Sequence, residues 1–414
     1  MKKTLRTLLT VPLAFTLAAN AATVVWTNTS GGAWSTAANW SPNQVPGSGD
    51  SAFITNDGNY TVTLDSGTTV ASIALGTSSG ASTQTLAWTG GVLRDCVLTL
   101  SSRGVLSLSG TADKELANST LNNGGTVIWS DPGALQARMV SSSLPPVLIT
   151  NLAGGIFDVK NDAGFTFYNP GYGGTFTIRF HNAGILRKSG GVGVTSFAGE
   201  WQFENAGTVE VQQGALQFPN GFANTGAFDL AIGTAVNLDG GIFSFAPGSL
   251  KTGAGALLVD DGSVTLTGTV PSLSWTGGAL ADSDFTVASN AVLAIGGAAD
   301  KTLLGNSTMN NAGTVTWAGT GALLARMVHT KPLVLITNLA GGLFELQNDA
   351  GFTYYDLYGG GVARFHNAGT LRKTGGPGTT SFDSHWQVVN TGSLTVQQGT
   401  IVFPGFQNDG NLVV

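Results

Sequence analysis

The chain has 414 residues, of which 42% are hydrophobic and only 10% are charged. The apolar share is large enough to form a core, which excludes a disordered polar tract. The net charge of −6 argues against a nucleic-acid partner, because affinity for phosphate comes from Lys and Arg. A single cysteine, Cys96, cannot form an internal disulfide, so stability has to come from packing and backbone hydrogen bonds.

The first residues have the order of a secretory signal. Lys2, Lys3 and Arg6 form a basic start, an apolar run follows at residues 8–18, and Ala-Asn-Ala at 19–21 is a small-x-small cleavage site. The apolar run is too short to span a bilayer, and no later stretch holds 18 apolar residues in a row. We therefore expect residues 1–21 to be a signal peptide and the protein to be extracellular or at the cell surface.

Residues 22–87 have no second copy in the chain. This segment contains Trp26, Trp34 and Trp40. Repeat proteins end in atypical units that cover the core. We therefore expect an N-terminal cap followed by the first coils.

The rest of the chain is a long internal duplication. Residues 88–274 form a first long repeat with connecting coils, and residues 275–414 form a second repeat that ends early. Matching stretches, shifted by 185 to 188 residues, are WTGG at 88 and 275, RMV at 138 and 326, LITNLAGG at 148 and 335, HNAG at 181 and 366, and VQQG at 211 and 396. Self-similarity on this scale indicates a repeat architecture.

A shorter unit lies inside each long repeat. It starts with Asn-x-Gly at Asn123, Asn182, Asn205, Asn224, Asn311, Asn367, Asn390 and Asn408. Strands of period two follow most of these turns, which predicts half-buried β-structure. The residues expected in the core are Val209, Val211, Leu216 and Phe218, with their counterparts Leu394, Val396, Ile401 and Phe403. Units of about 20 residues predict an all-β fold, a right-handed parallel β-helix (β-solenoid) with short turns and Asn-x-Gly corners.

An antiparallel sandwich or a propeller is the competing architecture. A propeller requires a blade signature every 40–50 residues or so, and the sequence has none. A sandwich does not account for Asn at the same turn in successive units, whereas stacked coils would let these side chains form a hydrogen-bonded ladder.

The residues after the signal include Gly-Gly-Ala-Trp at 31–34, Asn39-Trp40, Val45-Pro46 and Asp-Ser-Ala-Phe-Ile at 50–54. Together with the stretch at 367–376, they resemble large exported β-helix proteins of bacteria. These include the passenger regions of autotransporters and proteins with autotransporter-associated β-strand repeats. The resemblance implies export, a rod-like passenger, and adhesion or matrix roles, and it supplies no catalytic residues.

Polar residues present in both repeats are the candidates for chemistry. The histidines, His181 and His366, are interpreted as turn residues, with a ligand or base as the alternative. The aspartates of Asn-Asp-Ala-Gly, Asp162 and Asp349, are expected to form Asx turns, with an acid role as the alternative. The pairs Asp113-Lys114 and Asp300-Lys301 are expected to be exposed loops.

Six further residues are candidates for ligand binding: Arg187, Lys188, Trp201, Arg372, Lys373 and Trp386. The strand register would point Lys188 and Lys373 inward, which an unpaired ammonium does not tolerate. We expect the strand to end there and the lysine to extend outward. The alternative is a basic contact for an anionic glycan. The two tryptophans would stack on sugar rings, or else pack in the core or at its rim.

No catalytic, metal or cofactor site is expected. The sequence lacks zinc spacing, a nucleophile elbow, a phosphate loop and a calcium nonapeptide repeat. The preferred hypothesis is a structural or adhesive passenger that meets an extracellular glycan or a host or neighbour surface. The alternative is a carbohydrate-binding or polysaccharide-degrading β-helix.

The second repeat stops soon after Asn408-Asp-Gly, at Val414. A solenoid that ends in this way exposes an apolar cross-section and unpaired backbone groups. From this we expect a fragment of a longer protein, or end-to-end self-association through the C-terminal coil.

Overall fold

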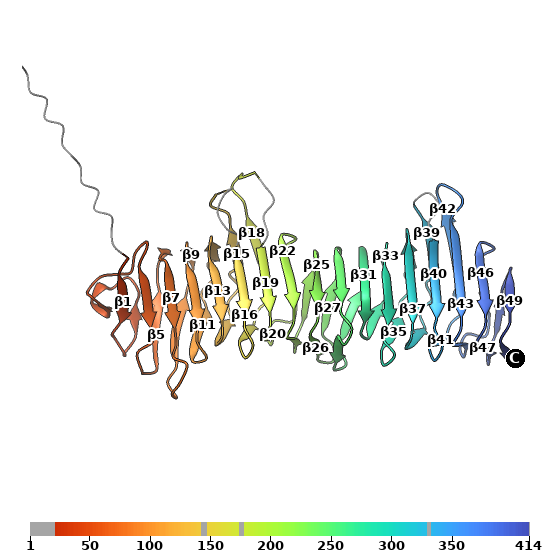
Figure 1. Ribbon diagram of the computed structural model, residues 1–414, viewed down its shortest axis with the longest axis horizontal. Coiled ribbons are helices and arrows are strands. Elements are labelled where there is room, and N and C mark those ends of the chain that lie inside the picture. Colours follow the sequence, from red (N-terminus) through yellow and green to blue (C-terminus); the bar gives the residue numbers. More distant parts are fainter. Residues whose placement is uncertain (1–20, 142–146, 174–177, 329–332, 414) are drawn as a thin grey trace, which may run out of the picture.

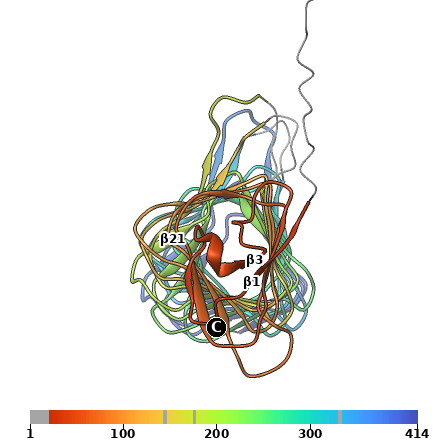
Figure 2. The same ribbon diagram turned by 90° about the vertical axis from the view of Figure 1, so that its left-hand side faces the viewer.

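The structure is a computed structural model that describes residues 21–141, 147–173, 178–328 and 333–413. All but the last residue of the expected signal peptide, residues 1–20, lies outside the described residues. The chain forms a rod (Figure 1), and its coils wrap around a common axis (Figure 2). Each regular coil has three strands rather than the two that the sequence pattern suggested. The two predicted strands follow the asparagine corner, and the additional strand leads into it, as Trp201–Asn205 does before Thr208–Val211.

One sheet, called here the long sheet, runs from the first coil to the last. Its strands are β1 (Thr23–Trp26), β4 (Ser51–Ile54), β7 (Ser72–Leu75), β10 (Val97–Leu100), β13 (Thr120–Asn123), β16 (Leu148–Asn151), β19 (Ile178–Asn182), β22 (Trp201–Asn205), β25 (Gly221–Asn224), β28 (Ile242–Phe245), β31 (Ser263–Val270), β34 (Asp284–Val287), β37 (Ser307–Asn311), β40 (Leu333–Asn338), β43 (Val362–Asn367), β46 (Trp386–Asn390) and β49 (Phe406–Asn408). Every step between these neighbours is parallel.

Four further groups of strands complete the coils. The second sheet has β2 (Gly32–Ala33), β5 (Tyr60–Leu64), β8 (Gln84–Trp88), β11 (Gly104–Leu108), β14 (Thr126–Trp129), β17 (Ile156–Val159), β20 (Ile185–Lys188), β23 (Thr208–Val211), β26 (Ala227–Leu230) and β29 (Leu250–Thr252). The third has β6 (Thr68–Thr69), β9 (Gly91–Arg94), β12 (Lys114–Ala117), β15 (Leu135–Arg138) and β18 (Phe165–Tyr168). The fourth has β21 (Val194–Ser196), β24 (Ala215–Phe218), β27 (Ala235–Leu238), β30 (Ala256–Val259), β32 (Leu273–Trp275), β35 (Val292–Ile295), β38 (Thr314–Trp317), β41 (Leu343–Leu346), β44 (Thr370–Lys373), β47 (Ser393–Val396) and β50 (Asn411–Val413). The last group, which joins the long sheet through β31, has β33 (Ala279–Ala281), β36 (Lys301–Leu304), β39 (Leu323–Met327) and β42 (Phe352–Asp356), and beyond it β45 (Thr379–Ser381) pairs with β48 (Thr400–Val402).

The expected parallel β-helix is confirmed, and the sandwich and propeller are excluded. Among the described strands only β3 (Trp40–Ser41) pairs in an antiparallel manner, with β1. It follows a short 3₁₀ turn, η1 (Ala37–Asn39). At this end of the rod Trp40 packs edge-on against both Trp26 and Trp34, with ring centroids 5.0 and 4.7 Å apart.

The expected core residues of the first repeat, Val209, Val211, Leu216 and Phe218, are all buried. In the second repeat Leu394 is buried, but the expectation is wrong for Val396, Ile401 and Phe403, which are half-buried. Val396 lies on β47, Ile401 lies on β48 and Phe403 follows β48, all in the last coils described. Their inward direction is as expected, but too few further strands pack over them to exclude water.

The expected asparagine ladder is present in both repeats. Inward-facing asparagines donate from Nδ2 to Oδ1 of the next coil at 2.6–2.8 Å. The first ladder joins Asn123, Asn151, Asn182, Asn205 and Asn224, and the second joins Asn311, Asn338, Asn367, Asn390 and Asn408. The Asn-x-Gly pattern missed Asn151 and Asn338, because a longer Asn-Leu-Ala-Gly-Gly corner follows each of them.

The cross-section of the rod is rebuilt between the two repeats. In the first repeat a coil passes from the long sheet to the second sheet, which ends at β29, whereas in the second repeat the coil passes directly to the fourth sheet. The eight-residue strand β31 makes this change, since its start pairs with β33 and its end pairs with β34. Within the described residues, the long sheet is therefore the only one in which equivalent strands of both repeats share one face.

Candidate functional site

The two candidate tryptophans are core residues. Trp201 and Trp386 begin β22 and β46 with 1% of their surface exposed. Each indole N–H donates to a backbone carbonyl oxygen, that of Thr166 at 3.1 Å and that of Thr353 at 3.0 Å. Their rings pack against Phe165 and Phe352. Packing in the core is therefore confirmed, and the candidate role of these tryptophans in stacking on sugar rings is wrong, since neither ring offers a free face.

The candidate lysines do not extend outward. Lys188 is fully buried, and its Nζ donates to Asp162 Oδ1 at 2.8 Å and to the Thr195 hydroxyl at 3.1 Å. The carbonyl oxygens of Asn161 and Gly190 complete this cage. The inward register predicted for Lys188 is confirmed, but the expected outward extension of its side chain is wrong. The conformation is tolerated because four acceptors surround the ammonium.

Lys373 repeats this arrangement in the second copy. Its Nζ donates to Asp349 Oδ1 at 2.8 Å, to the Gly375 carbonyl oxygen at 2.9 Å and to the Thr380 hydroxyl at 3.2 Å. The carbonyl oxygen of Asn348 is the fourth acceptor. A caged and buried ammonium cannot reach a ligand, so Lys188 and Lys373 are excluded as ligand contacts.

The aspartates act as counter-ions, not as the expected Asx-turn residues. Asn348 closes that turn, accepting from the Ala350 N–H at 2.9 Å. The hydrogen bond from Lys373 holds the pKa of Asp349 below its ordinary value. At Asp162, desolvation alone would raise the pKa. The bonds from Lys188 and from the Gly193 N–H outweigh it and leave the pKa lowered.

Lys114 and Lys301 were expected in exposed loops, and this is wrong. Both are fully buried at the start of β12 and β36. Lys301 Nζ donates to the carbonyl oxygens of Ala299 at 2.7 Å and Gly297 at 3.1 Å, and Lys114 Nζ donates to Gly110 O at 2.6 Å. Desolvation lowers the pKa of both lysines. Each lysine side chain lies at the edge of the core, beside a turn that contains a glycine.

The candidate arginines are surface ion-pair members on different sheets. Arg187 Nε lies 2.6 Å from Glu210 Oε2, on the second sheet. Arg372 Nη2 lies 2.7 Å from Glu345 Oε1, on the fourth sheet. Because the cross-section changes between the repeats, these equivalent arginines do not share a face. Each is also already neutralised by a carboxylate.

Outward-facing residues of the long sheet form the strongest candidate site. The alternating strands β19 and β43 point Phe and Asn inward, and they point Arg179 and His181, or Arg364 and His366, outward. The next strands add an exposed glutamine. The same set, Arg179–His181–Gln202 and Arg364–His366–Gln387, thus occurs in both repeats on one continuous sheet. We refer to these sets as the first and second RHQ sites.

The second RHQ site lies in a groove of about 380 Å³. Arg364 Nε donates to Gln387 Oε1 at 3.1 Å, and His366 Nε2 lies 3.3 Å from the Thr391 hydroxyl. Leu335 and Val389 flank these polar groups. The groove therefore combines hydrogen-bond donors with apolar walls.

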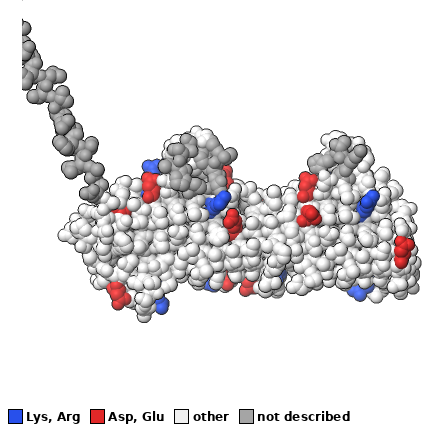
Figure 3. All heavy atoms as spheres, in the orientation of Figure 1, with Lys and Arg blue, Asp and Glu red and all other residues white. Residues whose placement is uncertain are grey.

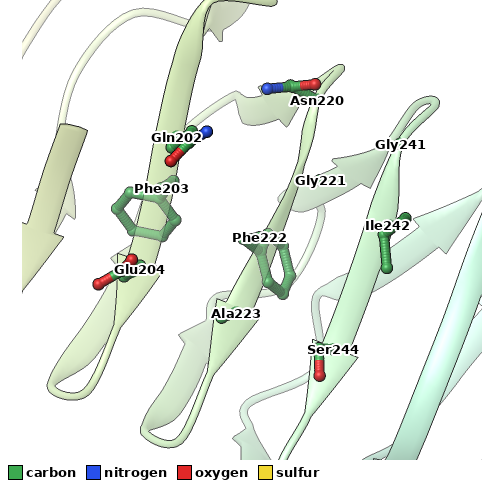
Figure 4. Close-up of a pocket in the computed structure, with 10 residues that line it drawn as sticks. All are labelled: Gln202, Phe203, Glu204, Asn220, Gly221, Phe222, Ala223, Gly241, Ile242 and Ser244. Atoms are coloured by element: carbon green, nitrogen blue, oxygen red, sulfur yellow. The ribbon is translucent and has the colours of Figure 1, made fainter. Parts of the chain in front are cut away.

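The first RHQ site differs at two neighbours, since Ala206 stands where the second site has Thr391. Glu204 occupies the position of Val389, and its Oε2 lies 3.4 Å from His181 Nδ1. Beside it, a groove of about 440 Å³ crosses β22, β25 and β28. Figure 4 shows its origin: Gly221 and Ala223 on β25 leave a hollow between Gln202 and Glu204 on one side and Ile242 and Ser244 on the other.

The chemistry of these grooves suits binding. Glu204 is the only carboxylate in the larger groove, and the second RHQ groove has none. Paired acids, which glycoside hydrolysis generally uses, are therefore absent from the lining residues of both. Among the described residues, no three His, Cys, Asp or Glu side chains gather in a way that could hold a metal ion.

Sequence reasoning named both histidines but missed Arg179, Arg364, Gln202 and Gln387. A usable signal was present, since Arg-Phe-His-Asn recurs at 179 and 364 with alternation that turns Arg and His outward. Comparisons with protein-family models and with curated proteins gave no match. In the part of the chain that is described, no helix is long and apolar enough to cross a bilayer.

Proposed function

We propose that the chain is an exported β-helical rod that acts as a structural or adhesive element outside the cell. It would contact an extracellular glycan or a neighbouring surface through the outward face of the long sheet. The supporting observation is the RHQ set, which recurs in both repeats on the long sheet, the one sheet of the described residues that runs from the first coil to the last.

Several features support a mechanical role. Sixteen parallel steps of about 4.8 Å give the long sheet a length of about 80 Å. Backbone ladders run through every coil, and the two asparagine ladders add side-chain hydrogen bonds inside. Small-angle scattering of the purified rod should give a maximum dimension of this order. A compact sphere would contradict the rod.

Export is tested by the fate of the N-terminus. The full chain, expressed in a Gram-negative host, should leave the cytoplasm and lose residues 1–21, so that mass spectrometry finds Ala22 first. Adhesion is tested by retention on immobilised extracellular polysaccharides, measured together with reducing ends. Retention without new reducing ends is expected. Release of reducing ends would favour the polysaccharide-degrading alternative, and no retention on any surface would contradict adhesion.

We further propose that the 414-residue chain, expressed by itself, associates end to end through its last coil. Phe403 and Phe406 stack with ring centroids 4.6 Å apart, and Phe406, Leu412 and Val413 are exposed. Exposed apolar groups beside strand edges favour pairing with a second copy. Light scattering should show association that increases with concentration and weakens in Leu412→Asp. A monomer at all concentrations would contradict this proposal.

A further inference from the structure

Building on the proposed adhesive function, we infer that the long sheet binds a linear polysaccharide that carries carboxylates, a polyuronate. The two RHQ sites would hold the same polymer at two points. Arg179 and Arg364 would bind carboxylates, and the histidine and glutamine side chains would bind ring hydroxyls.

The charges of Arg179 and Arg364 indicate an anionic ligand. Three other arginines on the surface, Arg138, Arg187 and Arg372, lie 2.6–2.7 Å from a glutamate oxygen. Among the described residues, no carboxylate lies within ion-pair distance of Arg179 or Arg364, and both are exposed. A guanidinium matches the planar geometry of a carboxylate and binds it through two parallel hydrogen bonds.

The apolar walls of the groove indicate a sugar ring. Leu335 lies beside Arg364 on the preceding strand of the long sheet, and Val389 lies beside His366 on the following strand. These side chains offer apolar surface on either side of the polar groups, with Phe365 below. A pyranose ring has apolar C–H faces and a rim of hydroxyls, which suits apolar walls with a few well-placed polar groups.

The spacing of the sites indicates a polymer. Eight parallel steps separate β19 from β43, a distance of about 38 Å along the rod. Both sites face outward from the same sheet. A chain long enough to reach both would gain from a high effective concentration at the second site.

Other polymers fit less well. Nucleic acid requires many phosphate contacts, whereas Figure 3 shows few and scattered Lys and Arg side chains, with no continuous basic stripe on the face in view. A peptide that added a β-strand would need a free edge, whereas β19 and β43 are paired on both sides. An acidic peptide that lies across the face is tested below.

The two sites should differ in strength. Glu204 adds a negative charge beside the first site, where the second site has Val389. Like charge weakens the binding of a carboxylate. The second site should therefore dominate, and Glu204→Val should strengthen binding whereas Val389→Glu should weaken it.

The experiment measures binding of the purified full-length rod to polygalacturonate, to its fully methyl-esterified form and to dextran sulfate. Wild type should bind polygalacturonate and lose at least tenfold in affinity when the carboxylates are esterified. Arg364→Gln should lose about 10- to 100-fold, as expected for a charge-assisted bond, and adding Arg179→Gln should remove the remainder. Arg103→Gln, which removes an exposed arginine in the loop after β10, is the charge-matched control and should bind like wild type.

The outcomes separate this inference from the proposed function. If the rod binds the esterified polymer or another neutral glycan, and neither arginine variant changes that binding, the ligand is not acidic. The adhesive function would still stand. If poly-glutamate binds as tightly as polygalacturonate, the ligand need not be a carbohydrate. If dextran sulfate binds more tightly, the site does not select carboxylates. No binding to any glycan or cell surface would contradict both proposals. Unchanged thermal unfolding of the variants shows that a loss is local.

Discussion

His181 and Arg364 lie in one row of outward-facing residues on the long sheet, although the duplication aligns His181 with His366. The row passes through Glu204, Ala223, Ser244, Thr267, Asp284, Thr308 and Leu335. The extra length of β31 displaces the second repeat by two residues, about 6.6 Å along the strand direction. A polymer that joins the two RHQ sites therefore runs nearly along the rod axis and crosses the strands almost at right angles.

This geometry predicts a dependence on ligand length. Oligogalacturonates shorter than about 38 Å should occupy the second RHQ site alone, and longer ones should bind about 10²-fold tighter or more by reaching both. Calorimetry on a length series should show the step in wild type and not in Arg179→Gln. A smooth increase with length in both proteins would contradict two-site binding.

Replacing Val211 by Asp should destabilise the rod strongly. Val211 is fully buried on β23, so the carboxylate would lack both water and a partner. A cost of several kcal/mol is expected, measured as a loss of unfolding free energy in urea. Val192→Asp, at a position 81% exposed, should change little. Equal effects of the two variants would show that the inward face is misassigned.

The buried lysines should respond differently to substitution by methionine. Lys373→Met leaves Asp349 without its cation and the buried Thr380 hydroxyl and Asn348 carbonyl oxygen without their ammonium donor, so it should destabilise the rod more than Lys301→Met. Lys301→Met removes only bonds to carbonyl oxygens and relieves the burial of a charge, so its cost should be about 1–2 kcal/mol. Denaturant titrations compare the two. Adding Asp349→Asn to Lys373→Met should recover part of the loss, and no recovery would contradict the pairing.

Acid should weaken the rod through the same pairs. The folded-state pKa of Asp349 is lowered, so its contribution to stability is present above the unfolded pKa of about 4. It is lost as the pH falls through the lower folded value. Unfolding free energies measured from pH 5 downward should therefore decline, and less steeply in Asp349→Asn. Parallel slopes for the two proteins would contradict this coupling.

Adjacent asparagines on β13 offer a matched test of the ladder. Asn123 points inward and donates to Asn151 Oδ1 at 2.7 Å, whereas Asn122 points outward. Asn123→Ala leaves a buried amide oxygen unsatisfied and should cost about 1–3 kcal/mol. Asn122→Ala should stay within about 0.5 kcal/mol of wild type. Equal thermal shifts would mean that the ladder adds no stability.

The sequence predicted the parallel coils, the core of the first repeat and the asparagine ladder, because these depend on local alternation and on residues repeated at corners. It did not predict the fate of Lys188. An inward lysine looks unfavourable until the coil geometry brings Asn161, Asp162 and Thr195 around it. Nor did it show that Arg187 and Arg372 lie on different sheets, since that depends on how β31 divides its pairing.

The interruption between the asparagine ladders has a consequence for how the rod comes apart. The first ladder ends where Asn224 donates to Ser249 Oγ, and the second begins at Asn311. In the coils between these two points, adjacent coils are joined by backbone hydrogen bonds and packing, without a series of asparagine side-chain hydrogen bonds. Repeat proteins unfold by nearest-neighbour coupling. Under a pulling force the rod should therefore separate more readily in this stretch than within either ladder.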